Sequence, residues 1–125
     1  MRTLERTVLE NVVQMHKETG GSTTDLATGW EPERPKRYVV ADSGSSECFD
    51  VLTSDVLADY IARHPILTSS KCKRVLGTWR SDSGCCWVET CYPYIHRDLA
   101  LHAARNAKQT HIFDLKNRAL LRVDA

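Results

Sequence analysis

Three residues that can ligate a metal ion, Cys86, Cys91 and His96, follow one another at five-residue intervals, with Cys72 and Cys85 nearby. Thiolate and imidazole groups are the ligands that structural zinc prefers. In an extended strand, however, Cys86 and Cys91 would point to opposite faces, and the chain has no short Cys-x-x-Cys knuckle. We therefore predict no metal site here, and expect thiols that fill space in the interior.

A thiol enzyme would need a cysteine within hydrogen-bonding reach of a histidine that a carboxylate orients. Cys91 could be combined with His96 or His102, and with Glu89 or Asp98. Cys91 is not expected at a sharp turn or a helix N-terminus, where a thiol pKa falls. We therefore predict that the protein is not an enzyme and has no cofactor, with a small thiol enzyme as a secondary alternative.

The five cysteines form an odd set in a chain without a recognisable export signal. Free, reduced thiols and a cytoplasmic location are the expectation from that pattern. The longest uncharged apolar runs are too short for a membrane span, so we predict a soluble protein without a membrane partner. A length of 125 residues predicts a single domain, 1–125, large enough to bury a core.

Charge is divided unevenly along the chain. Residues 1–70 hold seven Lys or Arg against eleven Asp or Glu, whereas residues 71–125 hold ten against five, which makes the halves −4 and +5. If the basic side chains converge, they could bind phosphates, so a nucleic-acid-binding protein that uses its C-terminal half is the first alternative function. The arginines chosen as candidates for that surface are Arg74, Arg80, Arg97 and Arg105. A near-neutral total and the absence of a known nucleic-acid motif oppose this alternative.

The stretch over residues 74–95 must position most of these groups, and it predicts two long strands joined by a turn at residues 81–84. With an even-numbered turn, Val75, Gly77 and Trp79 would share the core face with Cys86 and Val88, and an odd turn would exchange the faces. Glycine in the middle of a strand predicts a bulge or an aromatic ring lying over bare backbone.

The remaining elements surround this hairpin. An amphipathic helix is expected within residues 1–21, starting at Thr3, and a connecting segment over 22–37. A second hairpin is expected from strands at 38–42 and 48–52, then a helix at 55–64 that Thr53 or Ser54 caps. A helix at 96–109 and a third hairpin from 111–114 and 119–123 complete an α+β core over residues 38–125. The predicted order after the first helix is ββαββαββ, a mainly antiparallel sheet with helices packed on one side. The apolar stripe expected on the first helix consists of Leu4, Val8, Val12 and Met15, widened by Leu9 and Val13. The inner face expected on the last helix consists of Leu99, Ala100, Ala103, Ala104 and Ala107.

Two short phrases carry a resemblance. Residues 76–79 read LGTW before a turn, and residues 105–115 read RNAKQTHIFDL where a helix gives way to a strand. This pattern resembles small uncharacterised accessory proteins of bacterial phages, plasmids and other mobile elements, in which LGTW precedes a turn and a phrase such as RNQKAIFDL ends a helix. The order differs here after Asn106. The resemblance implies an accessory, host-interacting or counter-defence role and supplies no catalytic residues.

The leading functional interpretation is a non-enzymatic module that binds another protein, here a host protein. Trp30, Trp87 and Tyr94 are the predicted anchors, because large aromatic side chains dominate the energetics of protein interfaces. The N-terminal amphipathic helix offers a further contact, through which the chain could form a homodimer.

Overall fold

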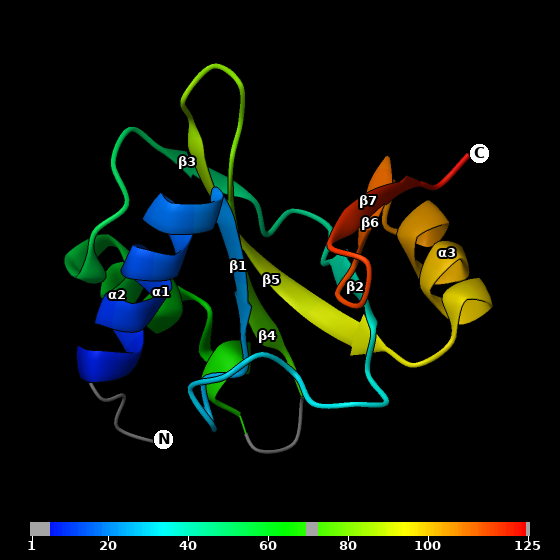
Figure 1. Cartoon of the computed structure of the whole chain (residues 1–125), viewed down its shortest axis with the longest axis horizontal. Helices are drawn as coiled ribbons and strands as arrows, with labels where there is room; N and C mark the ends of the chain where they lie inside the picture. The colour runs from blue at the N-terminus through cyan, green and yellow to red at the C-terminus, as the bar shows by residue number, and fades with distance from the viewer. Residues whose placement is uncertain (1–5, 70–72, 125) are drawn as a thin grey trace.

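A computed structural model describes residues 6–69 and 73–124, and in them three α-helices accompany one antiparallel, curled sheet of seven strands (Figure 1). The strand order is β1-β4-β5-β2-β6-β7, with β3 also paired to β5. The α+β class is therefore confirmed. In chain order the elements are α1 (Arg6–Thr19), β1 (Gly21–Thr24), β2 (Tyr38–Ala41), β3 (Glu47–Phe49), α2 (Ser54–Arg63), a 3₁₀ turn (Pro65–Thr68), β4 (Val75–Arg80), β5 (Cys86–Tyr94), α3 (Arg97–Asn106), β6 (His111–Asp114) and β7 (Ala119–Arg122).

The central hairpin forms as predicted, and Cys86 and Val88 of β5 lie on the core face as expected, but the residues of β4 take the opposite faces from those expected with an even turn. Five residues, 81–85, separate β4 from β5, and Gly84 takes the positive φ of 87° that closes the loop. Because this number is odd, Trp79 pairs with Trp87, and Thr78 pairs with Val88. The helix face of the hairpin consists of Leu76, Thr78, Cys86, Val88 and Thr90. Its outer face consists of Val75, Gly77, Trp79, Trp87, Glu89 and Cys91.

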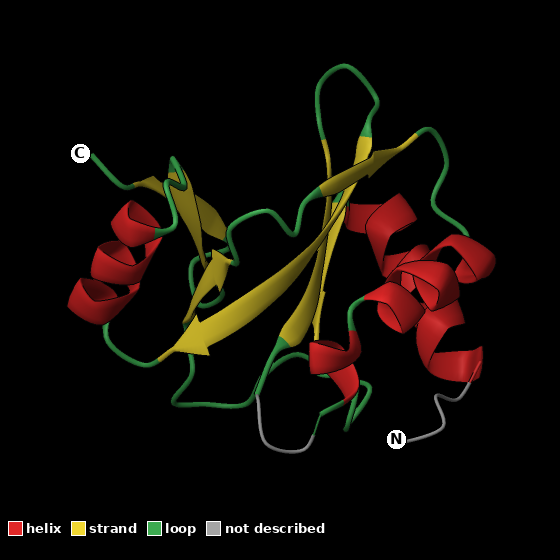
Figure 2. Cartoon of the chain, turned by 180° about the vertical axis from the view of Figure 1, so that it is seen from behind, coloured by secondary structure: helices red, strands yellow, loops and turns green. Residues whose placement is uncertain are grey.

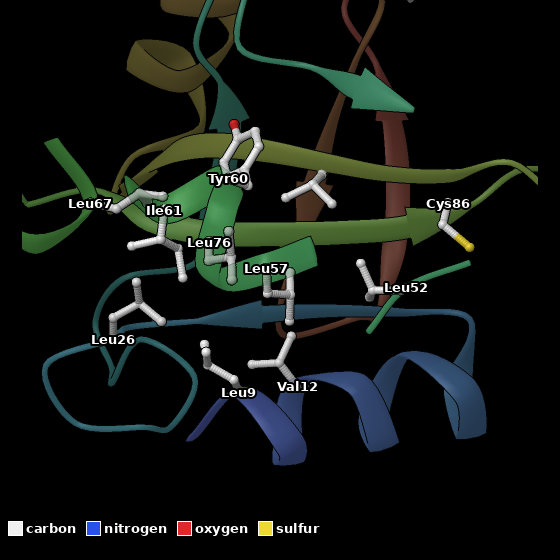
Figure 3. Close-up of a cluster of buried hydrophobic side chains, with 11 residues drawn as sticks. Leu9, Val12, Leu26, Leu52, Leu57, Tyr60, Ile61, Leu67, Leu76 and Cys86 are labelled. Atoms are coloured by element: carbon white, nitrogen blue, oxygen red, sulfur yellow. The ribbon is translucent and has the colours of Figure 1, made fainter. Parts of the chain in front are cut away.

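The main core lies between the helix face and the helices α1 and α2 (Figure 3). Leu57 and Leu76 are fully buried there, and Leu9 and Val12 reach them from α1. A second cluster holds α3 against β2 and β6, where Ala100 and Ala104 allow close approach of the helix. By strand register Tyr38 and Val40, which meet α3, lie on the same face as Val88, so the helices cover one face from opposite ends of the sheet (Figures 1 and 2).

The predicted hairpin between 38–42 and 48–52 is wrong. β2 and β3 do not pair with each other, and instead they lie one after the other along the same edge of β5. Residues 42–46 form a protruding turn between them, in which Asp42 N–H donates to Thr90 O at 2.8 Å and Thr90 N–H donates to Ser45 Oγ at 3.2 Å. Tyr60 from α2 donates to Ser45 O at 2.8 Å, which anchors the turn in the core. Hydrogen bonds to β5 therefore replace those of a local hairpin.

The predicted connecting segment 22–37 also needs correction, because residues 21–24 form the edge strand β1 beside β4. The order after α1 is thus βββαββαββ, one strand more than expected. The third hairpin, β6 with β7, is confirmed, as is the cap of α2, where the Thr53 side chain accepts from Val56 N–H. In the described part of the chain, no helix combines the length and the apolar character needed to cross a bilayer.

Two helix faces differ from their predicted patterns. In α1 the exposed residue is Met15, and the buried one is His16, whose Nδ1 lies 3.0 Å from Thr78 Oγ1. In α3 the predicted inner residue Leu99 is exposed, whereas Ala100 and Ala104 are buried against the sheet with Leu101 packed beside them. The expected helix start at Thr3 and the expected contact of Leu4 lie outside the described residues.

Candidate binding surface

The outer face of the central hairpin carries a pair of tryptophans. Trp79 and Trp87 are cross-strand neighbours, with ring centroids 5.8 Å apart and ring planes inclined by 14°. Trp79 is 43% exposed and Trp87 is half-buried. Because the helices pack on the opposite face, this end of the sheet presents apolar aromatic surface to solvent. We refer to Trp79, Trp87 and Glu89 as the tryptophan–glutamate patch.

Glu89 is held in a defined position beside the indoles. Its Oε1 accepts from Trp79 Nε1–H at 2.9 Å and from the Ser46 hydroxyl at 3.2 Å. The other oxygen, Oε2, receives only a long contact of 4.0 Å from the Cys91 thiol. Among the ion pairs of residues 6–69 and 73–124, none involves Glu89. The patch therefore contains a carboxylate with spare acceptor capacity.

A disulfide between Cys48 and Cys85 lies next to Trp87 and contradicts the expectation of five free thiols. Cys48 is directly opposite Trp87 in the pairing of β3 with β5, and Cys85 immediately precedes β5. The Cα atoms are 6.0 Å apart, a separation within the range that a disulfide spans. Sequence reasoning missed the bond because the partners are brought together by strand pairing over 37 residues. Within the described part, Cys86 and Cys91 are the free, buried cysteines, and Cys72 lies outside it.

The other end of the outer face is closed. Val75 and Cys91 are buried there against Val39 from β2 and Leu115 from the turn after β6. Burial raises the pKa of the Cys91 thiol well above its ordinary value, and the nearby charge of Glu89 acts in the same direction. Cys91 is therefore a protonated, inaccessible thiol at neutral pH, which is the opposite of an activated nucleophile.

The histidines considered for catalysis do not lie in the described contacts of Cys91. His96 precedes α3 and is exposed, and His102 contacts Asn106 within α3 at 3.2 Å. In residues 6–69 and 73–124, no group of three or more His, Cys, Asp or Glu side chains is placed to share a metal ion.

The three predicted aromatic anchors lie in different environments. Trp87 belongs to the patch described above, whereas Trp30 is 76% exposed in the loop after β1, where its carbonyl accepts from Asp25 N–H. Tyr94 is half-buried in the core beneath α3, with its ring 4.8 Å from that of Tyr92. Tyr94 is thus as half-buried as Trp87 but belongs to a different part of the sheet, where it packs with the cluster beneath α3.

The four candidate arginines do not gather into one phosphate site. Arg74 precedes β4 and Arg80 ends it, so about 20 Å of strand separates their backbones. Arg74 is paired with Asp42 at 2.7 Å and lies over the Tyr92 ring. Arg97 and Arg105 lie at the two ends of α3, and Arg105 donates to the Val123 carbonyl. Lys71, also part of the predicted basic surface, lies outside the described residues.

Sequence reasoning identified Trp87 and placed Glu89 on the same face, but with an even turn it assigned Trp79 to the opposite face. The available signal was the parity of the hairpin: counting residues 81–85 as the loop places all three side chains on one face. The local sequence does not indicate that this face is exposed to solvent, because its exposure depends on which face of the sheet the helices pack against. Comparison with protein families, with curated proteins and with solved structures finds no match for this chain.

Proposed function

We propose that this chain is a non-enzymatic interaction module that binds another protein through the tryptophan–glutamate patch. The observation that carries the proposal is the stacked pair of indoles, one exposed and one half-buried, on the face of the hairpin opposite the described helices. Tryptophan contributes a large apolar area with few rotatable bonds, and it is enriched among the residues that dominate interface energies. A rigid strand pair with a cross-linked neighbour holds the rings in place before binding.

The accessory and counter-defence role belongs to the same proposal. It is supported by the resemblance of residues 76–79 and 105–115 to small proteins of phages and other mobile elements, and in that role the partner is a host protein. The cytoplasmic location expected from the cysteine pattern stays a prediction, and the Cys48–Cys85 bond weakens it, because disulfides persist mainly in oxidising compartments.

Two alternatives receive less support from the geometry. A nucleic-acid surface would align cations with exposed aromatic rings, whereas the charged side chain beside the tryptophans is the carboxylate of Glu89. A homodimer through α1 would need a free apolar stripe, but Leu9 and Val12 are already buried against the sheet.

The test is affinity capture of the partner from the source cells, with three matched variants. We expect Trp79→Ala and Trp87→Ala each to weaken recovery of the captured protein at least about tenfold, the scale of an interface hot spot. Trp30→Ala removes an equally large and more exposed ring from another loop, so it should leave recovery unchanged. Circular dichroism and thermal melting of each variant establish that it is folded.

Nuclease treatment and salt separate the two kinds of partner. A protein contact centred on indoles should survive nuclease and the change from low to physiological salt, whereas a nucleic-acid contact weakens steeply with salt. Recovery that Trp30→Ala abolishes, or that folded Trp79→Ala and Trp87→Ala leave intact, would remove the patch as the binding site.

A further inference from the structure

We propose that the tryptophan–glutamate patch recognises an arginine side chain of its protein partner, an inference that rests on the proposed function and specifies its chemistry. The guanidinium would bind Glu89 Oε2 and lie against the indole surface. Two observations point to this ligand. The carboxylate of Glu89 is held in position by Trp79, and it lies beside the stacked rings of Trp79 and Trp87.

The carboxylate is prepared for a cation. Oε1 is occupied by the donors Trp79 Nε1–H and Ser46 Oγ–H, and these two bonds fix the direction in which the group points. Among residues 6–69 and 73–124, Oε2 has only the 4.0 Å thiol contact from Cys91, so its lone pairs are available to a further donor. An incoming N–H donor on a cation would complete the group with a charge-assisted hydrogen bond.

The charge around the patch is complementary to a cation. On the outer face of β4 and β5, Glu89 is the charged side chain, and its neighbours there are apolar, aromatic or glycine. Arg80, adjacent in sequence to Trp79, belongs by register to the helix face. On the described outer face of these two strands, a positively charged partner group therefore meets a negative site and no cationic side chain.

The aromatic rings select the kind of cation. An indole attracts a positive charge placed over its face more strongly than the other aromatic side chains do. Arginine suits this site better than lysine, because its planar guanidinium can stack on a ring while its N–H groups in the same plane reach a carboxylate. Glu89 and Trp79 are joined by a hydrogen bond, so one guanidinium can touch both.

Nuclear magnetic resonance can test the inference without knowledge of the partner. The chain has three tryptophans, and each indole N–H gives its own signal. The ¹⁵N-labelled full chain is titrated with acetyl-Gly-Arg-Gly-amide, and separately with the citrulline peptide, which keeps the shape of arginine but lacks its charge. We expect the signals of Trp79 and Trp87 to move with the arginine peptide, while that of Trp30 stays in place.

The charge requirement is tested with Glu89→Gln, which keeps an oxygen to accept from Trp79 Nε1–H and so preserves the local structure. We expect this variant, and the citrulline peptide on the original chain, each to bind about fivefold more weakly, the scale of one exposed ion pair with a ring contact. Asp82→Asn, in the hairpin loop, is the matched control and should leave the affinity unchanged.

The inference is overturned if the citrulline peptide binds as well as the arginine peptide, if Glu89→Gln has no effect, or if no indole signal moves at tens of millimolar peptide. Its failure differs from failure of the proposed function. A partner lost with Trp79→Ala but retained by Glu89→Gln would leave a protein-binding patch whose ligand is not arginine, whereas a partner unaffected by both changes would remove the patch altogether.

Discussion

Arg37 and Asp114, which are 77 residues apart in sequence, form two parallel hydrogen bonds of 2.8 Å, from Nε to Oδ1 and from Nη2 to Oδ2. The pair joins the start of β2 to the end of β6, and the Asp114 side chain is only 2% exposed. The Arg37 guanidinium, with backbone N–H groups of Lys116 and Asn117, lowers the pKa of Asp114 from 3.8 to about 2. This bidentate pair, in which the carboxylate is buried, attaches the start of β2 to the end of β6.

We predict that Asp114→Asn lowers the free energy of unfolding at pH 7 by about 2 kcal/mol, because the two hydrogen bonds from Arg37 lose their charged acceptor. Asp124→Asn breaks the exposed pair with Arg122 and is the control, with an expected change below about 0.5 kcal/mol. Urea denaturation followed by tryptophan fluorescence measures both. Equal effects of the two substitutions would show that the Arg37–Asp114 pair does not stabilise the fold.

The same pair makes a prediction for acid stability. The carboxyl of Asp114 has the lower pKa in the folded state, so the unfolded chain binds a proton first as pH falls. The contribution is present above pH 3.8 and is lost between 3.8 and about 2. Urea midpoints measured through this window should fall less steeply for Asp114→Asn than for the original chain. If the urea midpoint falls equally steeply with pH in both proteins, the Asp114 carboxyl does not have a lowered pKa in the folded state.

His16 predicts a second pH dependence, near neutrality. Burial and the charge of Arg80 lower its pKa below 6.5, and its Nε2 has no hydrogen-bond partner within the described part of the chain. The unfolded chain therefore takes up a proton at a higher pH than the folded chain does, so stability should decrease as pH falls from 7.5 to 5.5. His16→Leu should flatten this slope, whereas His102→Gln, at an exposed position, should retain it. Urea midpoints measured from pH 7.5 to 5.5 for the original chain and the two variants test this prediction.

We predict that position 77 requires glycine, because the thiol of Cys91 on the neighbouring strand occupies the space that a side chain would need. Gly77 pairs regularly with Glu89, with neither a bulge nor a covering aromatic ring, and a Cβ built on it would lie 2.9 Å from Cys91 Sγ. Gly77→Ala should lower the free energy of unfolding by about 2 kcal/mol, because the interior there has no spare volume. The double variant Gly77→Ala, Cys91→Ala should be destabilised by less than the sum of the two single changes. Additive effects would show that the two side chains do not compete for space.

The Cys48–Cys85 bond is predicted to stabilise both the fold and the patch. A cross-link over 37 residues reduces the entropy of the unfolded chain by an amount worth about 4 kcal/mol on a loop-closure scale. Cys48→Ser should lower stability by up to that amount and shift the Trp87 emission to longer wavelength, because β3 loses its attachment beside that ring. The double variant Cys48→Ser, Cys85→Ser should match the single one. Peptide mapping of oxidised protein that finds both thiols free would refute the pairing.

The sequence by itself determined the elements that depend on short-range patterns. Apolar spacing predicts α1, α2 and α3, and the cluster of serines and glycine at residues 81–84 predicts the central hairpin. Thr53 was recognisable as a cap because the hydrogen bond to Val56 N–H spans three residues. These features need only a few neighbouring residues, so periodicity and turn chemistry suffice to find them.

Only the tertiary structure decided which surfaces those elements present. One additional loop residue, Cys85, reversed the faces of β4 relative to β5, since side chains alternate along a strand. The strand pairing of β3 with β5, rather than with β2, brought Cys48 beside Trp87 and within bonding distance of Cys85, and a local pattern holds no information about a disulfide partner 37 residues away. The tryptophan–glutamate patch is exposed because the helices occupy the opposite face, and this choice follows from burial summed over the whole core.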